Sequence, residues 1–355
     1  MSMTRTGSVT LNTGENSGTA LNVRGSYAYI GTSTSPSIIV AVDISNPALP
    51  SRVSALSLSS GENNSRGTLP IIGNYALDLL YLDPGKVITV DISNPLSLSK
   101  VASFTENTGE FGPYEFIVVG NYGYIINGRN SLTLPTILTV VDVSNPVSLT
   151  RLGAVTLAAG EAKDNAPGVA VKGNYAYIST WQAPARFVVV DISNPASPTE
   201  VTRITLNTGE NNARGVTIQG NYAYIIISTS PARLVVVDIS NPLAPVRVGG
   251  LTLAAGENSG RNITIQGIYA YIILILNPGK MVKVDISNPS APVEVETFTM
   301  NSGEASQGEI VVSGNYAYLT TSGSPATLVI VSLGAPAVKP AQGSIPHRMV
   351  AAGVL

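Results

Sequence analysis

The sequence contains no cysteine and only one histidine, His347, among its 355 residues. The missing cysteines exclude disulfide frameworks, thiol nucleophiles, and zinc or iron–sulfur sites with cysteine ligands. A single histidine excludes histidine-rich metal sites, and His347 lies outside the repeated part of the chain, where nothing would orient it for a catalytic triad. No nucleophile elbow, phosphate loop or dinucleotide fingerprint is present. We therefore expect a protein that is not an enzyme and holds neither a metal nor a cofactor.

Charged residues are also scarce, at 12% of the chain, and the formal net charge is −2. A protein that binds nucleic acid by neutralising phosphates carries an excess of basic residues, so that class is excluded. The longest apolar stretch, around residues 269–276, is too short to span a bilayer, and the first residues lack the apolar core of a secretory signal. We expect an extracellular surface or a virion-like particle as the location, with the cytoplasm as an open alternative.

A repeat of 47 to 51 residues runs through almost the whole chain. Its first marker is the segment Asp-Ile-Ser-Asn-Pro or a close variant, with the acid at Asp43, Asp91, Asp142, Asp191, Asp238 and Asp285. Its second marker is a Tyr-x-Tyr unit, which begins at Tyr27, Tyr75, Tyr122, Tyr175, Tyr222, Tyr269 and Tyr316. In the second copy, Leu77 replaces the later tyrosine. Self-similarity at this period indicates a repeat architecture.

Each copy of the repeat predicts four short strands. In the fifth copy they are residues 215–220, 221–228, 233–240 and 246–253, which are rich in Val, Ile, Tyr and Thr and are bounded by Gly, Asn-Pro or Ser-Pro. The two middle strands are almost continuous apolar runs, so both of their faces must be covered. Small sheets packed face to face provide that cover, and four strands per repeat are typical of a β-propeller.

The two ends of the repeat region complement each other. The last copy stops matching after Leu333 and lacks its fourth strand, whereas residues 5–15 match the fourth strand and following loop of the other copies. Residues 5–333 number 329, which is seven times 47. We therefore predict an all-β fold over residues 1–333: a seven-bladed β-propeller of four-stranded antiparallel blades, with the N-terminal strand closing the last blade.

Residues 334–355 lie beyond the last repeat. Three prolines disfavour a long helix or a central strand there, and the final residues are apolar, unlike an ordinary solvated tail. We predict an extended C-terminal arm that contacts its own ring, a neighbouring copy in an assembly, or another protein partner.

The repeats resemble those of the LVIVD-repeat β-propeller family. The matching strings are Gly-Asn-Tyr-Ala-Tyr-Ile followed by Val-Val-Val-Asp-Ile-Ser-Asn-Pro, in residues 173–195 and again in residues 220–242. The resemblance implies the propeller fold and brings no catalytic residues with it. This sequence departs from the family pattern in the Gly-Glu-Asn type of loop between repeats, so a relative's ligand would not carry over.

Two of the repeated motifs have structural explanations. Thirteen of the 15 tyrosines lie in the Tyr-x-Tyr units, where alternate residues share one face of a strand, and we expect these rings to pack on a neighbouring blade. The aspartate of each Asp-Ile-Ser-Asn-Pro segment should accept turn N–H groups, after which Asn-Pro sets the turn. Calcium loops place more oxygen ligands at a different spacing.

A third repeated motif, a Gly-Glu pair, lies in the loop that leads from one repeat to the next. These loops should lie on one face of the propeller, together with the loops between the second and third strands. Their carboxylates could order the loops through nearby basic residues such as Arg66, Arg214 and Arg261, or form a ring that binds a cation or a basic partner. The carboxylates are Glu15, Glu62, Glu110, Glu161, Glu210, Glu257 and Glu304.

The third and fourth repeats depart most from the pattern, and a unique partner must be recognised by what differs between repeats. We predict Tyr114, Arg129 and Trp181 as binding residues, because aromatic and arginine side chains dominate binding hot spots. The leading hypothesis is a structural or interaction protein that binds a protein or glycan partner. The alternative is a glycan-active hydrolase or lyase that uses Glu115 and Asp164, the two acids of the irregular loops.

Overall fold

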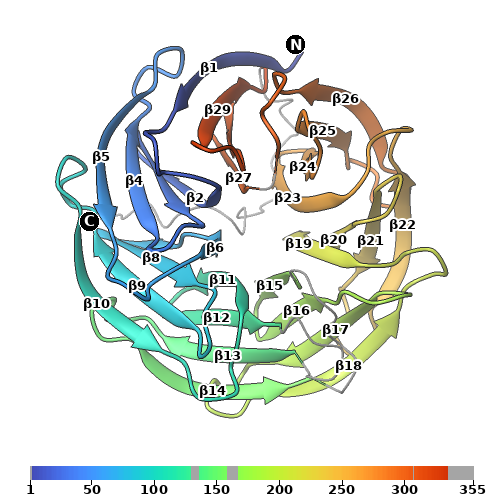
Figure 1. Cartoon of the computed structure of the whole chain (residues 1–355). Coiled ribbons are helices and arrows are strands. Elements are labelled where there is room, and N and C mark those ends of the chain that lie inside the picture. Colours follow the sequence, from blue (N-terminus) through green and yellow to red (C-terminus); the bar gives the residue numbers. More distant parts are fainter. Residues whose placement is uncertain (1, 129–135, 158–166, 307, 335–355) are drawn as a thin grey trace.

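The computed structural model is a ring of β-sheets arranged around a central axis (Figure 1). It describes residues 2–128, 136–157, 167–306 and 308–334. Every regular element in these residues is a strand, as the alternation of short Val- and Ile-rich runs with turn residues predicts. No helix in the described part of the chain is long and apolar enough to cross a membrane.

Each repeat places its strands in sequence order from the ring centre to the rim. The innermost strands are β2 (Gly18–Arg24), β6 (Ser65–Thr68), β11 (Pro113–Val119), β15 (Val169–Lys172), β19 (Ala213–Gln219), β23 (Gly260–Gln266) and β27 (Ile310–Ser313). The second strands are β3 (Tyr27–Thr32), β8 (Tyr75–Leu80), β12 (Tyr122–Asn127), β16 (Tyr175–Ser179), β20 (Tyr222–Ile227), β24 (Tyr269–Leu274) and β28 (Tyr316–Thr320).

The third strands are β4 (Ile38–Asp43), β9 (Lys86–Asp91), β13 (Ile137–Asp142), β17 (Arg186–Asp191), β21 (Arg233–Asp238), β25 (Lys280–Asp285) and β29 (Thr327–Ser332). The outermost strands run along the rim in Figure 1 and are β1 (Thr4–Thr10), β5 (Ser51–Ser57), β10 (Ser99–Thr105), β14 (Thr150–Thr156), β18 (Thr199–Thr205), β22 (Val246–Thr252) and β26 (Val293–Thr299).

The core lies between neighbouring sheets. The middle strands are buried along almost their whole length, whereas the outermost strands are only partly covered. One cluster joins Tyr177 and Phe187 of one sheet to Ile218 and Ile225 of the next. In six of the seven units the later residue is a buried tyrosine, and in five of these six the earlier tyrosine packs at the edge of the same cluster, which confirms these rings as packing residues. Tyr122 of the third unit is exposed instead. Burial accordingly raises the pKa of Tyr177 to about 12.

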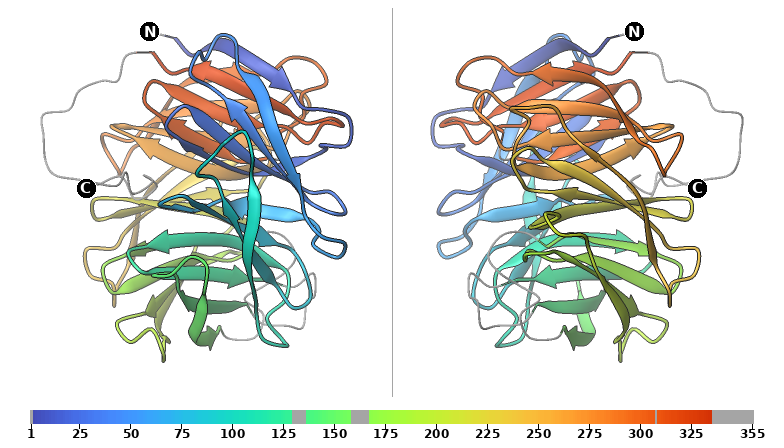
Figure 2. Two further views of the ribbon diagram at one scale, coloured as in Figure 1. Left: turned by 90° about the vertical axis from the view of Figure 1, so that its left-hand side faces the viewer. Right: turned by 90° about the vertical axis from the view of Figure 1, so that its right-hand side faces the viewer.

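The N-terminal strand completes the last sheet, as predicted. Strand β1 pairs antiparallel with β29 from Thr4 opposite Ser332 to Thr10 opposite Thr327. Figure 2 shows from two sides how the blue N-terminal strand lies beside the red strands at the end of the described chain. The sheet order β1-β29-β28-β27 therefore joins the two ends of the ring.

The sheets are not all separate four-stranded units. Five sheets have four strands each, but a sixth has nine, because β2 and β6 pair in parallel through Ala20–Gly67 and Leu21–Thr68. The expectation of uniformly four-stranded blades is corrected at this place. The innermost strand of this repeat is also interrupted. Pro70 cannot donate a ladder hydrogen bond, so the strand breaks into β6 and the short β7 (Ile71–Ile72).

The Asp-Ile-Ser-Asn-Pro segments form the predicted turns. Asp43 Oδ1 accepts the Ser45 N–H at 2.8 Å, and Asn46 Oδ1 accepts the Ala48 N–H at 3.2 Å. The same pair of bonds recurs in the later turns, for example at Asp238. The predicted C-terminal arm lies outside the described residues apart from Gly334.

Candidate functional site

The Gly-Glu loops pack on the loops between second and third strands, as predicted. The Glu62 carbonyl accepts the Ser37 N–H at 2.8 Å, and the Glu257 carbonyl accepts the Ala232 N–H at 2.7 Å. The glycine before each described glutamate has a positive φ, from 84° at Gly256 to 102° at Gly109, a conformation that side chains disfavour. The motif therefore contains glycine for its backbone geometry and glutamate for what its carboxylate binds.

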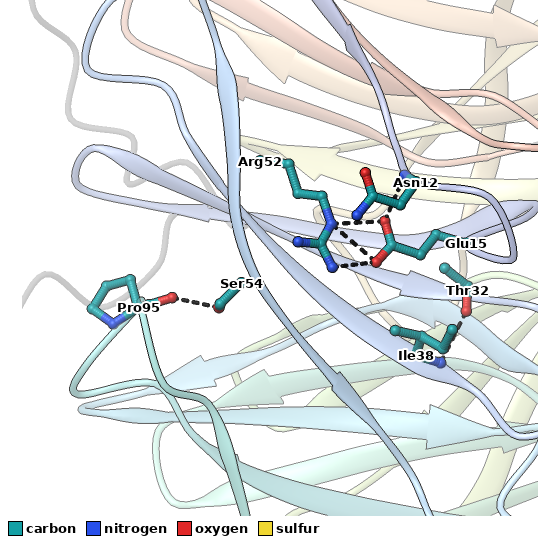
Figure 3. Close-up of polar contacts among 7 residues, drawn as sticks. All are labelled: Asn12, Glu15, Thr32, Ile38, Arg52, Ser54 and Pro95. Atoms are coloured by element: carbon teal, nitrogen blue, oxygen red, sulfur yellow. Dashed lines mark hydrogen bonds and ion pairs between the residues drawn. The ribbon is translucent and has the colours of Figure 1, made fainter.

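Most of the described glutamates bind groups within the chain. Glu15 Oε2 accepts the Asn12 N–H at 2.8 Å, and the carboxylate forms an ion pair with Arg52 of the outermost strand β5, with Nη2 at 2.5 Å from Oε1 (Figure 3). The equivalent pairs, at 2.6 to 2.7 Å, are Glu62–Lys100, Glu110–Arg151, Glu210–Arg247 and Glu304–Arg5. Each of these ion pairs therefore connects the loop between two repeats to the outermost strand of a sheet.

The partners and burial of these carboxylates differ from expectation. The cations come from outermost strands far along the chain, except for Lys86, which lies 3.7 Å from Glu62. The expected pairs of each glutamate with the arginine four residues later were therefore wrong: Glu62–Arg66, Glu210–Arg214 and Glu257–Arg261. Burial alone would raise the pKa of Glu62, but Lys100 and the Ser59 N–H lower it below its usual value. A hydrogen bond to a charged group under such cover contributes about 1.5–3 kcal/mol, more than an exposed pair.

Two repeats lack a cation at the rim position. Glu294 lies opposite Val284 in the register where Arg247 lies opposite Val237, and therefore places a second carboxylate beside Glu257. Burial and the Glu257 charge raise the pKa of Glu294. The other exception is Glu200, which forms an ion pair with Arg203 of its own strand. The glutamate that would complete this fourth set, Glu161, lies outside the described residues.

Replacing Glu294 by arginine should stabilise the protein. The E294R variant would supply Glu257 with the cation that Arg247 gives Glu210, and would remove the repulsion between two carboxylates. We expect a gain of about 1–2 kcal/mol, seen as a melting temperature about 2–4 °C higher at pH 7.5. The E294Q variant, which only removes the repulsion, should gain less. Equal melting temperatures for E294R and E294Q would refute the ion pair.

A second group of side chains gathers at the starts of the innermost strands. Arg66, Tyr114, Arg214 and Arg261 are each the second residue of their strand, in β6, β11, β19 and β23. These strands surround the ring centre in Figure 1. Neighbouring innermost strands approach closely there, because a Cβ added at Gly67 would lie 2.6 Å from the Tyr114 carbonyl oxygen. The repeat thereby brings residues that are distant in sequence to one end of the ring.

Aromatic rings hold two of these arginines. The Arg66 guanidinium carbon lies 5.6 Å from the centroid of the Tyr81 ring, and the Arg214 carbon lies 4.5 Å from that of Trp181. The Tyr81 and Tyr114 rings meet edge to face, with centroids 5.2 Å apart. Stacking on a ring fixes the plane of a guanidinium group and directs its N–H groups sideways. We refer to Arg66, Arg214, Arg261, Tyr81, Tyr114 and Trp181 as the arginine–aromatic cluster.

The cluster concentrates positive charge. Burial, together with the nearby charges of Arg261 and Arg66, lowers the pKa of Arg214 to about 9. Burial and Arg261 also lower the pKa of Arg66. Arg214 is only 7% exposed, and its Nε has no hydrogen-bond acceptor among the described residues. Among the residues that the structure describes, none of the three arginines forms an ion pair.

The predicted binding residues fall partly within this cluster. The structure brings Tyr114 and Trp181 to the same group of arginines, whereas Arg129 lies outside the described residues. Glu115 is buried in β11, and its proposed partner Asp164 lies outside the described residues, so this pair of acids stays a prediction. The three arginines were predicted as partners of the Gly-Glu loops. Each of them is the second residue of an innermost strand, and this shared position in the repeat could have revealed the cluster.

Known structures share the fold at low sequence identity. Kuenenia stuttgartiensis hydrazine synthase superposes with a TM-score of 0.67 and 12% identity over 90% of this chain and 96% of that one. The β-propeller domain of Cps50 (Swd1) from Myceliophthora thermophila gives 0.65 and 12% over 91% and 98%. BamB from Moraxella catarrhalis gives 0.55 and 13% over 93% and 99%. These similarities show a β-propeller fold and nothing about activity.

Sequence comparison identifies the family. No curated protein matches the chain. The LVIVD repeat model matches six segments, which together cover more than half of the chain: residues 17–56, 115–156, 160–205, 210–252, 259–300 and 303–337. The second repeat, where Leu77 and Pro70 depart from the pattern, is the one left unmatched. The repeat motifs, the ring of sheets and these six matches together show that the chain belongs to the LVIVD-repeat family.

Proposed function

We propose that this protein is a non-enzymatic interaction scaffold that binds a glycan partner through the arginine–aromatic cluster. In this proposal the ring has seven blades, with β2–β5 and β6–β10 acting as two of them. One observation carries the proposal: three arginines that form no ion pair with any described residue converge with three aromatic rings where the innermost strands begin. On the same face of the ring, five of the repeated glutamates form ion pairs with arginine or lysine side chains of the same chain.

Aromatic rings suit a glycan partner because sugars present an apolar ring face and a polar edge. Tyr81, Tyr114 and Trp181 are each partly exposed, so part of each ring is accessible to solvent. Tyrosine and tryptophan offer both an apolar face and a polar group. The proposed location is a cell or particle surface, where glycans are presented. The role of residues 334–355 as an arm that binds a protein partner or a second copy stays a prediction.

A glycan array tests the proposed function. We expect the full-length protein to bind a subset of immobilised glycans, and a Tyr114→Ala/Trp181→Ala double variant to lose about tenfold or more in affinity for them. The matched control is Tyr122→Ala, which removes an exposed tyrosine at the start of β12, on the opposite face of the ring from the cluster. Binding that survives the double variant, or no binding to any glycan, would contradict the proposal.

The same array separates binding from catalysis. Glycans recovered after incubation should be unchanged in mass, because a scaffold releases what it binds. Shortened or unsaturated products that disappear with Glu115→Gln would instead support a hydrolase or lyase and would overturn the non-enzymatic assignment.

A further inference from the structure

We propose that the arginine–aromatic cluster binds an acidic sugar, by its carboxylate or sulfate group. This inference rests on the proposed function and specifies the chemistry of its partner. It begins from three guanidinium groups, on β6, β19 and β23, that converge on one end of the ring. An oxyanion complements them best, because each guanidinium group carries a positive charge and has only N–H donors and no acceptor.

The arginines are held for binding rather than for packing alone. Arg66 lies over Tyr81 and Arg214 lies over Trp181, so two guanidinium groups are positioned against aromatic rings before a ligand arrives. A fixed guanidinium edge can donate two parallel N–H bonds to one carboxylate or sulfate group. Arg261 is anchored by its Nε, which donates to the Gly308 carbonyl at 3.3 Å. This bond restricts the orientation of the Arg261 guanidinium group.

Grouping these charges carries a cost in the free protein. Arg214 is more than nine-tenths buried, and its Nε has no acceptor among the described residues. Burying an arginine beside two others opposes folding, since like charges repel and desolvation disfavours the charged form. An anion at the cluster would relieve the repulsion. A site that destabilises the free protein in this way is typical of residues retained for binding.

A sugar fits better than an extended polyanion. A nucleic acid would require a basic track along its backbone, but the chain carries a net charge of −2 and acids recur around the same face. The Tyr114 hydroxyl donates to the Tyr81 hydroxyl at 3.4 Å, and a sugar hydroxyl can extend this hydrogen-bond network. The aromatic rings offer an apolar surface for the sugar ring. The cluster therefore matches an acidic saccharide in charge and in hydrogen-bond donors.

Trp181 provides a direct readout, since it is the only tryptophan in the chain. We would titrate the full-length protein with a galacturonic acid trisaccharide, its methyl ester, a sulfated disaccharide and inorganic phosphate, and follow Trp181 fluorescence. We expect saturable binding of at least one acidic saccharide, and about tenfold or weaker binding of the neutral ester and of phosphate. The trisaccharide and disaccharide arms distinguish carboxylate from sulfate.

Two matched variants separate binding from stability. Arg214→Gln should weaken saccharide binding about tenfold or more, and yet raise the melting temperature of the free protein, because it removes a buried like charge. Arg24→Gln makes the same charge change at the C-terminal end of an innermost strand, β2, where Arg24 donates to Asn74 Oδ1, and should change neither quantity. A purely structural Arg214 would instead lower the melting temperature when replaced.

Three results would overturn the inference: no saturable binding of either acidic saccharide, equal binding of the ester or of phosphate, or unchanged binding by Arg214→Gln. Neutral glycans that bind in a Trp181-dependent manner would leave the proposed function standing while refuting the acidic ligand. Failure of every glycan on the array would refute both.

Discussion

A chain lacking residues 1–12 is expected to melt at least about 10 °C below the full-length protein, or to fail to form a stable ring. The deletion removes β1, which pairs with β29 along its whole length. It also removes Met3 and Leu11, which are buried between the last sheet and its two neighbours. Strand β29, almost fully buried in the intact ring, would become an exposed edge.

The size of this effect follows from the groups lost. Burial of a side chain such as Met or Leu contributes about 1.5–3 kcal/mol, and the deletion adds the loss of a strand pairing and of the Arg5–Glu304 ion pair. Their sum approaches the whole stability of an ordinary domain, about 5–15 kcal/mol. Circular dichroism and thermal melts would measure it.

Milder variants on the same strand keep the result interpretable if the truncated chain does not fold. Leu11→Ala should cost about 2–5 kcal/mol, as for other buried leucines, whereas Ser8→Ala on the exposed face should stay within about 0.5 kcal/mol. A truncated chain as stable as the full one would mean that β1 does not close the ring.

The second large effect is a loss of stability with rising pH, caused by two buried acids. Burial raises the pKa of Asp78 to about 7 and that of Glu106 to about 8. Asp78 is 0% exposed, and Ser65 Oγ donates to its Oδ2 at 2.7 Å. Glu106 Oε1 accepts from Asn127 Nδ2 at 2.8 Å. Within the part of the chain that the structure describes, Asp78 Oδ1 and Glu106 Oε2 have no hydrogen-bond partner.

The sign follows from the direction of the shifts. Both acids have a higher pKa in the folded protein than in the unfolded chain, so the stability they contribute is complete below about pH 4 and is lost as pH rises to about 8. Each group should cost a few kcal/mol, in order of magnitude, once ionised. We therefore expect the melting temperature of the natural chain to fall by about 10 °C from pH 5.5 to pH 9.

Neutral variants should flatten this profile. Asp78→Asn and Glu106→Gln should each raise the melting temperature at pH 9 with little effect at pH 5.5, and the double variant should raise it most. Glu304→Gln is the opposite control, because binding to Arg5 and to Asn301 N–H outweighs burial and lowers the pKa of Glu304. Its stabilising effect is lost toward acidic pH, so this variant should be less stable at both values. A pH profile that is unchanged in the Asp78→Asn/Glu106→Gln variant would disprove the assignment.

Both acids could have been recognised as departures from the repeat. Asp78 occupies the strand position of Ile30 and Ile225, and Glu106 that of Leu58 and Leu206. Neither acid was among the site residues predicted from the sequence. A carboxyl group at a position that is apolar in the other copies is a direct sign of a shifted pKa.

The sequence by itself determined the elements, their order and the closing role of the N-terminal strand. Period-2 alternation, the continuous apolar middle strands and the turn residues are local signals, and repetition multiplies them. Even the turn function of Asp43 and its equivalents follows from local chemistry, because an aspartate side chain reaches N–H groups two residues away.

Tertiary structure alone decided which distant side chains meet. Glu15 pairs with Arg52 rather than with a nearby cation, because the outermost strand runs along the rim past the preceding loop. The joining of β2 to β6 likewise depends on the close approach of two strands that lie far apart in the sequence. Arg66, Arg214 and Arg261 come together only because the ring closes and places equivalent positions around one axis. The repeat shows which positions are equivalent, but the folded ring decides which of these positions come into contact.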